Sequence, residues 1–248
     1  MALKILHFDE LKSTNLFLYD KISEKHDISD MVVVASYQTE GRGMDKNKWQ
    51  SEAGKNLLFS IALNVSFLEA ENQFKISQAV SVAIIKTLEN MLDEAHFSIK
   101  WPNDIYFRDE KLAGILIQNT VEGRMMGFSI IGIGLNVNQT SFSDDLPNPI
   151  SLKMITDKDY NLDNVLNLLI INIKDAVESL CSDEGRAEIN RRYIEKLYRY
   201  HEWAFYKHQN RVKQLIIMGF DKYGRLLLQD KEGGEIVCDI KELQFVLP

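Results

Sequence analysis

The chain has 248 residues, of which 45% are hydrophobic and 26% are charged, and its formal net charge is −7. This composition is typical of a folded globular protein and argues against disorder. An acidic balance provides no general attraction for nucleic acid, so any site for a phosphate has to be built locally.

The two cysteines, Cys181 and Cys238, stand far apart and have neither CxxC spacing nor a histidine partner. This pattern argues against a zinc site and against a disulfide framework, and we expect both thiols to be buried in apolar surroundings. The N-terminus lacks the apolar core of a signal peptide, and the longest apolar runs have only the length of a strand. These features predict a cytoplasmic protein without a membrane segment.

The first 92 residues predict two helices and two strands around a long loop. In chain order these are a helix from Asn15 to about Lys25, a strand from Met31 to Gln38, a loop from Thr39 to Asn56, a strand that begins at Leu57 and a helix from Phe74 to Leu92. Ser13 or Thr14 is suited to cap the first helix. The loop is polar and shows neither helical nor strand periodicity. Loops of more than about a dozen residues are usually functional or mobile.

The middle of the chain predicts four neighbouring strands. "FSIKW" ends at Pro102, "DIYF" and "KLAGILIQNT" flank the turn "RDE", and "MMGFSIIGIGLNVN" follows. Strict alternation divides "KLAGIL" into two faces: Lys111, Ala113 and Ile115 on one, and Leu112, Gly114 and Leu116 on the other.

In the last hundred residues, the predicted elements change from helices to strands at Trp203. Before it, two amphipathic helices are predicted, from Leu162 to Leu180 and from about Glu184 to Tyr200. After it come short strands split by turns, which predict a small β-barrel or hairpin unit. The sequence therefore predicts an α+β fold: a mixed sheet with packed helices over residues 1–200, and a β unit over residues 203–248.

Two lysines next to apolar strands are the most informative feature. Lys100 opens "KWPND" and Lys111 opens "KLAGIL". Burying an unpaired ammonium group costs several kcal/mol or lowers its pKa. Each lysine alone is more simply an ordinary residue at a strand end. Both together on adjacent strand ends, with Asn103 and Asp104 between them, favour a site for an anion.

The long loop adds a second candidate region. Two glycines flank Arg42, which would let the backbone approach a ligand while the guanidinium group binds a phosphate or carboxylate. Trp49 is an aromatic surface on which a flat ligand can stack. The pattern is neither GxGxxG nor a P-loop, and a plain surface loop is an equal alternative. Ser13, Thr14 and Asn15 either cap a helix or bind a polar ligand.

In order along the chain, "STN", "YQTEGRG", "KNKWQS", "GKNL", "KWPNDI", "KLAGIL" and "GIGLNVN" resemble the motifs of biotin protein ligases. The similarity runs from about residue 8 to residue 155, and "KWPND" followed by "KLAGIL" is its most specific part. The resemblance implies a catalytic domain like that of class II synthetases, followed by a small SH3-like β-barrel.

The resemblance also implies a two-step reaction and a set of site residues. Biotin and MgATP would give biotinyl-5'-AMP and pyrophosphate, and the biotinyl group would pass to a lysine of a biotin carboxyl carrier protein or domain. The implied catalytic residues are Lys111, Lys100 and Arg42. The implied biotin-binding residues are Ser13, Thr14, Asn15, Gln38, Arg42, Gly43, Met44, Lys111 and Gly114. The implied ATP-binding residues are Arg42, Trp49, Lys100, Asn103, Lys111 and Asn136, with Asp104 as an outer-shell position for magnesium.

The chain departs from the family pattern in the loop. Met44, Lys46 and Asn47 stand where the family commonly has arginine, glycine and arginine, which changes the expected closure of the loop over the intermediate. The chain also starts almost at the catalytic domain, so no DNA-binding domain and no repressor function are expected. Two alternative functions stay open: a lipoate ligase or octanoyltransferase, and a biotin- or nucleotide-binding module without enzymatic activity. A homodimer is also possible.

Overall fold

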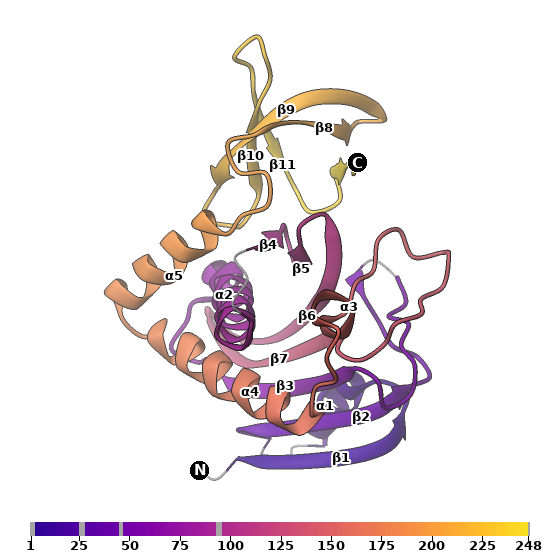
Figure 1. The fold of residues 1–248 in the computed structure, drawn as a ribbon. Coiled ribbons are helices and arrows are strands. Elements are labelled where there is room, and N and C mark those ends of the chain that lie inside the picture. Colours follow the sequence, from indigo (N-terminus) through magenta and orange to yellow (C-terminus); the bar gives the residue numbers. More distant parts are fainter. Residues whose placement is uncertain (1–2, 25–27, 45–46, 93–95, 248) are drawn as a thin grey trace.

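The computed structural model describes residues 3–24, 28–44, 47–92 and 96–247 of the chain (Figure 1). Lys46, one of the three departures in the loop, lies outside these ranges. Two β-sheets organise the fold, and the C-terminal sheet sits above the β4 and β5 edge of the larger one (Figure 1). The α+β class predicted from the sequence is confirmed.

The larger sheet has seven strands in the order β1-β2-β3-β7-β6-β5-β4. Only β1 and β2 pair in parallel, and the other neighbours are antiparallel. The strands are β1 (Lys4–Leu11), β2 (Met31–Gln38), β3 (Leu57–Asn64), β4 (Phe97–Lys100), β5 (Asp104–Phe107), β6 (Glu110–Glu122) and β7 (Met125–Leu135). Strand β1 was not predicted, because this partly exposed edge strand shows no regular alternation of buried and exposed residues.

Helices cover both faces of this sheet. On one face, α2 (Phe74–Met91) packs on the sheet and is flanked by α4 (Leu162–Ser179) and α5 (Asp183–Glu195), and the main hydrophobic core lies beneath them. On the other face, α1 (Thr14–Ser23) covers a smaller core. The short helix α3 (Leu152–Thr156) and the 3-10 turn η2 (Ala70–Asn72) complete the unit. A cavity lined by the start of α1 lies on this second face.

Helix ends follow the expected capping chemistry on the α2 side. Asn161 accepts a hydrogen bond from the backbone of Asn164 at the start of α4, and Ser182 accepts one from Gly185 at the start of α5. At α1, Ser13 takes the N-cap position but its hydroxyl does not cap the helix. The capping prediction was therefore wrong for this side chain, which lines a cavity instead.

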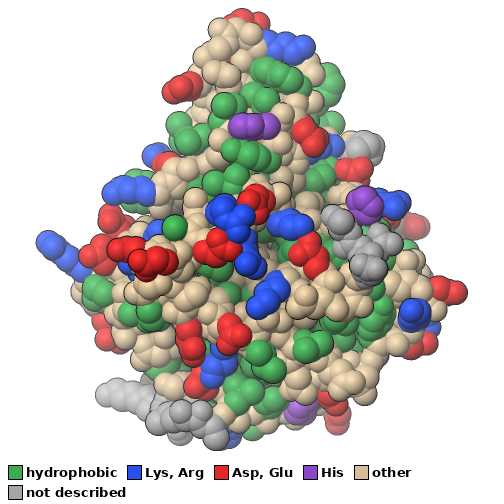
Figure 2. Space-filling model, turned by 60° about the vertical axis from the view of Figure 1, so that its left-hand side comes forward, with side chains coloured by type: hydrophobic (Ala, Val, Ile, Leu, Met, Phe, Trp, Pro, Cys, Tyr) green, Lys and Arg blue, Asp and Glu red, His purple; other side chains and the backbone are tan. Residues whose placement is uncertain are grey.

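The outer surface of α5 carries mixed charges. Arg191 and Arg192 both bind Glu188, with N to O distances of 2.7 and 2.5 Å, and these guanidinium groups hold the pKa of Glu188 down at about 2. On the face shown in Figure 2, Lys and Arg side chains are interspersed with Asp and Glu. Among the described residues, no helix has the length and apolar character needed to span a membrane.

The C-terminal unit is a five-stranded antiparallel sheet in the order β11-β10-β9-β8-β12. Its strands are β8 (Trp203–His208), β9 (Arg211–Phe220), β10 (Leu226–Gln229), β11 (Glu235–Cys238) and β12 (Leu243–Phe245). A second β unit at the C-terminus was predicted and is present.

Two predictions about this half of the chain were wrong. Helix α5 ends at Glu195, earlier than predicted, because the backbone then runs beside β4, where Ile99 bonds to Lys196 and Tyr198. Cys181 is exposed just after α4, whereas Cys238 is buried as expected.

Candidate active site

Glycines on two central strands form the floor of a cavity on the α1 face. Gly132 and Gly134 lie on β7, and Gly114 pairs with Gly134 from β6. A Cβ atom on Gly132 would lie 2.2 Å from Oδ1 of Asn15, and one on Gly134 would lie 2.3 Å from Cε2 of Trp49. Only glycine lets the Asn15 amide and the Trp49 indole rest directly on the sheet.

The cavity has a volume of about 130 Å³ and gathers residues from five separate parts of the sequence: 13–15, 38–49, 59, 103–116 and 132–134. Residues proposed from the sequence that line it are Ser13, Thr14, Asn15, Gln38, Arg42, Gly43, Met44, Trp49, Asn103, Asp104, Lys111 and Gly114. Every residue assigned to biotin binding from the sequence therefore lines this one cavity.

A buried hydrogen-bond network joins the first helix to the sheet at this cavity. The Gln38 side-chain oxygen accepts the backbone N–H of Thr14 at 2.7 Å. The hydroxyls of Thr14 and Ser60 are 2.6 Å apart, and the Ser60 hydroxyl donates to Asn15 Oδ1 at 2.5 Å. Asn15 Nδ2 donates in turn to the carbonyl of Leu116 at 3.0 Å. These bonds fix the orientation of polar groups in the wall before any ligand arrives.

Lys111 enters the cavity because β6 has a bulge at its start. Tyr106 pairs with Lys111 but Ile105 pairs with Ala113, so one extra residue is accommodated. As a result Lys111 faces the cavity together with Gly114, while Leu112 and Ala113 are buried in the main core. The predicted alternation, with Lys111 on the face of Ala113, was wrong for this reason.

The Lys111 ammonium group is paired and partly shielded from water. Its Nζ lies 2.7 Å from Oδ1 of Asp104, with the two side chains 32% and 15% exposed. It also lies 5.6 Å from the centre of the Trp49 ring. A half-buried cation of this kind keeps a fixed position and interacts more strongly with an anion than an exposed one would.

A larger cleft of about 980 Å³ adjoins the cavity and extends to the C-terminal sheet. Trp49, Asn103, Asp104 and Lys111 line both spaces. Lys111 therefore lies at the junction between a small polar cavity and a wide cleft.

Lys100 lines the cleft and not the small cavity. Its Nζ is 5.1 Å from the ring centre of Tyr106 and 5.1 Å from that of Phe245. Burial lowers the pKa of Lys100 below its usual value, an effect that Asp104 opposes and that Lys111 and Arg199 reinforce. The two predicted lysines are thus neighbours, with only Lys111 in the small cavity.

The two predicted asparagines have structural partners. Asn103 donates to the Ile115 carbonyl at 2.8 Å, and Asn136, which is buried, donates to the Ile150 carbonyl at 3.0 Å. Trp101, at the centre of "KWPND", donates its indole N–H to the Gly224 carbonyl at 2.8 Å and so links the two sheets. Residues of this motif therefore both line the cleft and hold its walls in place.

Sequence reasoning missed several residues of the cavity. Gly132 and Gly134, which line it, were taken as ordinary strand residues, although "GIG" places two glycines on one face of a strand, which is a signal for close approach. Ser60 was also missed; it does not line the cavity but belongs to the hydrogen-bond network beside it.

The described part of the chain contains no group of three or more His, Cys, Asp or Glu side chains that could hold a metal ion. Asp104, the suggested outer-shell residue, is already paired with Lys111.

The fold and the cavity together define a class of protein: an α+β protein with a small polar cavity on a glycine floor, next to a lysine and a second cleft. Comparison with known proteins identifies the group within this class. Residues 7–136 match the Biotin/lipoate A/B protein ligase family, and the chain belongs to that family.

Three known proteins illustrate the relationship. The bifunctional ligase/repressor BirA of Escherichia coli is 32% identical over 244 residues, which cover 91% of this chain and 71% of that protein. The biotin–protein ligase of Homo sapiens is 30% identical, but the match covers only 33% of its length. The biotin protein ligase of Aquifex aeolicus, solved in complex with biotin and ATP, shares the fold with a TM-score of 0.80 at 24% identity, over 99% of both chains.

Proposed function

We propose that the protein is a biotin-[acetyl-CoA-carboxylase] ligase, which joins biotin to a lysine of a biotin carboxyl carrier protein through biotinyl-5'-AMP. Family membership and the names of the relatives support the reaction class. The observation that carries the proposal is Lys111, a paired cation at the junction of a small polar cavity and a larger cleft.

The first step brings two anions together. The biotin carboxylate oxygen attacks the α-phosphorus of ATP, the bond from that phosphorus to the bridging oxygen breaks, and pyrophosphate leaves. Two like charges 4 Å apart repel by roughly 4 kcal/mol at an effective dielectric constant near 20. The Lys111 ammonium group lowers this repulsion and stabilises the charge that develops on the phosphoryl oxygens.

Other residues have supporting roles in the proposal. Ser13, Thr14, Asn15 and Gln38 bind the biotin head. Arg42, Gly43 and Met44 cover the biotin and the phosphates, Trp49 packs on the adenine, and Lys100, Asn103 and Asn136 line the nucleotide side. Magnesium enters as part of the MgATP substrate, held by phosphates and water.

The second step transfers the biotinyl group. The amine of a carrier lysine attacks the acyl carbon of biotinyl-5'-AMP, AMP leaves, and the attacking nitrogen loses a proton to give an amide. A hydrolysable intermediate needs protection from water. The loop over residues 39–56 is proposed to supply it by closing over the ligand.

The polar network at the cavity favours biotin over lipoate. The ureido ring of biotin carries two N–H donors and one carbonyl acceptor, which suit the hydroxyl and amide groups of Ser13, Thr14, Asn15 and Gln38. The dithiolane ring of lipoate has no such groups and would make none of these hydrogen bonds, so it would bind less well.

The proposal is tested by incubating the protein with MgATP and either biotin or lipoate, and measuring pyrophosphate release and the mass of an added carrier domain. Biotin-dependent pyrophosphate release with a mass increase of the carrier supports it. Faster transfer of lipoate would assign the chain to the lipoate branch of the family. Binding of biotin without pyrophosphate release would indicate a binding module. The division into residues 1–200 and 203–248, the cytoplasmic location and the oligomeric state remain predictions.

A further inference from the structure

An aromatic residue of the C-terminal sheet covers a lysine of the cleft. The Lys100 ammonium group lies between two rings, each centred 5.1 Å from Nζ. One ring is Tyr106 on β5, next to the strand that carries Lys100. The other is Phe245 on β12, which belongs to the other sheet. A cation between two ring faces is attracted to both.

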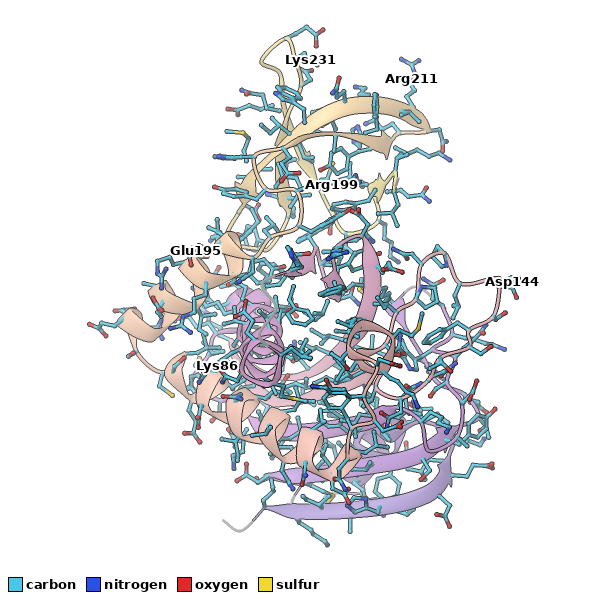
Figure 3. The ribbon with its side chains drawn as sticks, viewed as in Figure 1. Lys86, Asp144, Glu195, Arg199, Arg211 and Lys231 are labelled. Carbon is cyan, nitrogen blue, oxygen red and sulfur yellow. The ribbon has the colours of Figure 1, made fainter. Side chains whose placement is uncertain are left out.

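Phe245 is itself held firmly by its own sheet. In the β12 and β8 pairing it stands opposite Tyr206, and the two rings are 5.0 Å apart. Its ring also lies 6.1 Å from that of Tyr198. The next residue, Val246, accepts a hydrogen bond from Arg199 Nη1 at 2.9 Å, and Figure 3 shows Arg199 where the two units meet. The position of the Phe245 ring therefore follows the position of the C-terminal sheet.

The charged groups around Lys100 do not by themselves hold its ammonium group in the cleft. Asp104 on β5 attracts its ammonium group, whereas Lys111 on β6 and Arg199 before β8 repel it. Asp104 is already 2.7 Å from Lys111 and cannot be reserved for Lys100. Two ring faces hold the ammonium group in the cleft without neutralising its charge, so it stays available to an anionic ligand.

We propose that Phe245 is a positioning residue, which holds Lys100 in the nucleotide cleft and so makes the adenylation step depend on the C-terminal sheet. The inference rests on the proposed function, because it assigns Lys100 to the nucleotide side of that reaction. It adds a residue outside all of the motifs on which the family resemblance depends.

The test compares Phe245→Leu with a matched control, Phe220→Leu. Phe220 is also an aromatic residue of the C-terminal sheet that contacts the larger unit, but it packs against Phe74 and Tyr193, with ring distances of 5.3 and 5.4 Å. Phe220 does not line the cleft. Both variants lose an aromatic contact between the two units, and only Phe245→Leu uncovers Lys100.

In pyrophosphate-release assays, we expect Phe245→Leu to lower kcat/KM for ATP by roughly threefold to thirtyfold, the range of a lost cation–π contact. KM for biotin should stay within about twofold of the wild-type value, because Lys100 does not line the small cavity. Phe245→Tyr keeps the ring and should restore the wild-type kinetics. Phe220→Leu should lower the midpoint of thermal unfolding without this loss for ATP.

A second measurement does not depend on activity. An amine-reactive acylating reagent followed by mass spectrometry gives the labelling rate of Lys100 relative to that of the exposed Lys158. Phe245→Leu should raise this ratio several-fold, and Phe220→Leu should leave it unchanged.

The outcomes separate the two proposals. Wild-type kinetics for Phe245→Leu, or the same loss in both Leu variants, or an unchanged Lys100 labelling ratio, would each overturn the role of Phe245 while leaving biotin ligation intact. No biotin-dependent pyrophosphate release by the wild-type protein would overturn the proposed function and this inference with it.

Discussion

Lys111 owes its place in the cavity to an irregularity in the β5 and β6 pairing. Lys111 pairs with Tyr106 in the β5 and β6 ladder, and on the other side its N–H and C=O bond to the carbonyl of Asn148 and the N–H of Ile150. The side chain is then free to meet Asp104. Bulges often redirect a side chain next to an active site.

Replacing Lys111 tests its proposed role directly. Lys111→Ala should lower the rate of biotin-dependent pyrophosphate release by about 100-fold or more, as expected for loss of a charge that stabilises the transition state. Biotin affinity, measured by calorimetry, should fall less. The control is Lys174→Ala, since Lys174 forms a comparable half-buried pair with Asp30 at 2.8 Å, outside both cavities. Near-normal pyrophosphate release by Lys111→Ala would contradict the assignment.

The close contact between Gly134 and Trp49 leads to a second prediction. A methyl group at position 134 would overlap the indole, so Gly134→Ala should displace Trp49 and lower kcat/KM for ATP by about tenfold, the loss typical of an aromatic stacking contact. If Trp49 carries the effect, Gly134→Ala should cost little more in a Trp49→Ala background. Fully additive losses in this double-mutant cycle would show that the glycine acts by another route.

The loop between β2 and β3 is the element in which this chain departs most from its family pattern. Its described part turns back on itself, with Gly43 N–H bonded to the Asn47 carbonyl at 2.7 Å and Trp49 N–H bonded to the Gly41 carbonyl at 3.0 Å. Met44 lines both the cavity and the cleft. An apolar side chain there provides no charge to hold the phosphate of an adenylate.

Met44→Arg should therefore retain the intermediate better. We expect less free biotinyl-5'-AMP in solution from the variant than from the wild-type protein, by a fewfold, because a charge-assisted hydrogen bond to the phosphate is added. Chromatography of the filtered reaction, without a carrier protein, measures it. Met154→Arg, at an exposed position on α3, is the control. Equal release by Met44→Arg and the wild-type protein would end the hypothesis.

The helices and strands that were predicted well are those whose apolar residues follow a local pattern. Strand β2 has the predicted bounds, and α2 and α4 differ from prediction by one residue at their ends. Their apolar residues repeat with the period of the element itself. The predictions failed where a contact with another segment decides the geometry, as at the end of α5 beside β4 and at the bulge in β6.

At the scale of the whole molecule, tyrosines concentrate where the two sheets meet. Tyr106 and Tyr206 both have a pKa raised to about 12 by burial, and burial also raises the pKa of Tyr193 and Tyr198. An unfolded tyrosine ionises near pH 10. The stability from keeping these phenols neutral is fully present below pH 10 and is lost as the pH rises through about 12.

Tyr206→Phe tests this at one position. In the described structure its buried hydroxyl has no hydrogen-bond partner, so the free energy of unfolding at pH 7 should stay the same or rise by up to about 1 kcal/mol. Urea denaturation between pH 9 and pH 12 should show a smaller loss of stability than in the wild-type protein. Tyr223→Phe, at an exposed position in the turn between β9 and β10, is the control. A steeper alkaline loss in Tyr206→Phe would contradict the argument.

By itself, the sequence determined the α+β class, most elements, the polar and charged residues of the site and the resemblance to a ligase family. These depend on local periodicity, on residue chemistry and on the order of motifs. Only the tertiary structure decided that α1 delivers Asn15 onto a glycine floor, that a bulge turns Lys111 toward Asp104, and that Phe245 reaches Lys100 from the other sheet. Such contacts join residues far apart in the chain, and they depend on strand register and packing, which no local pattern encodes.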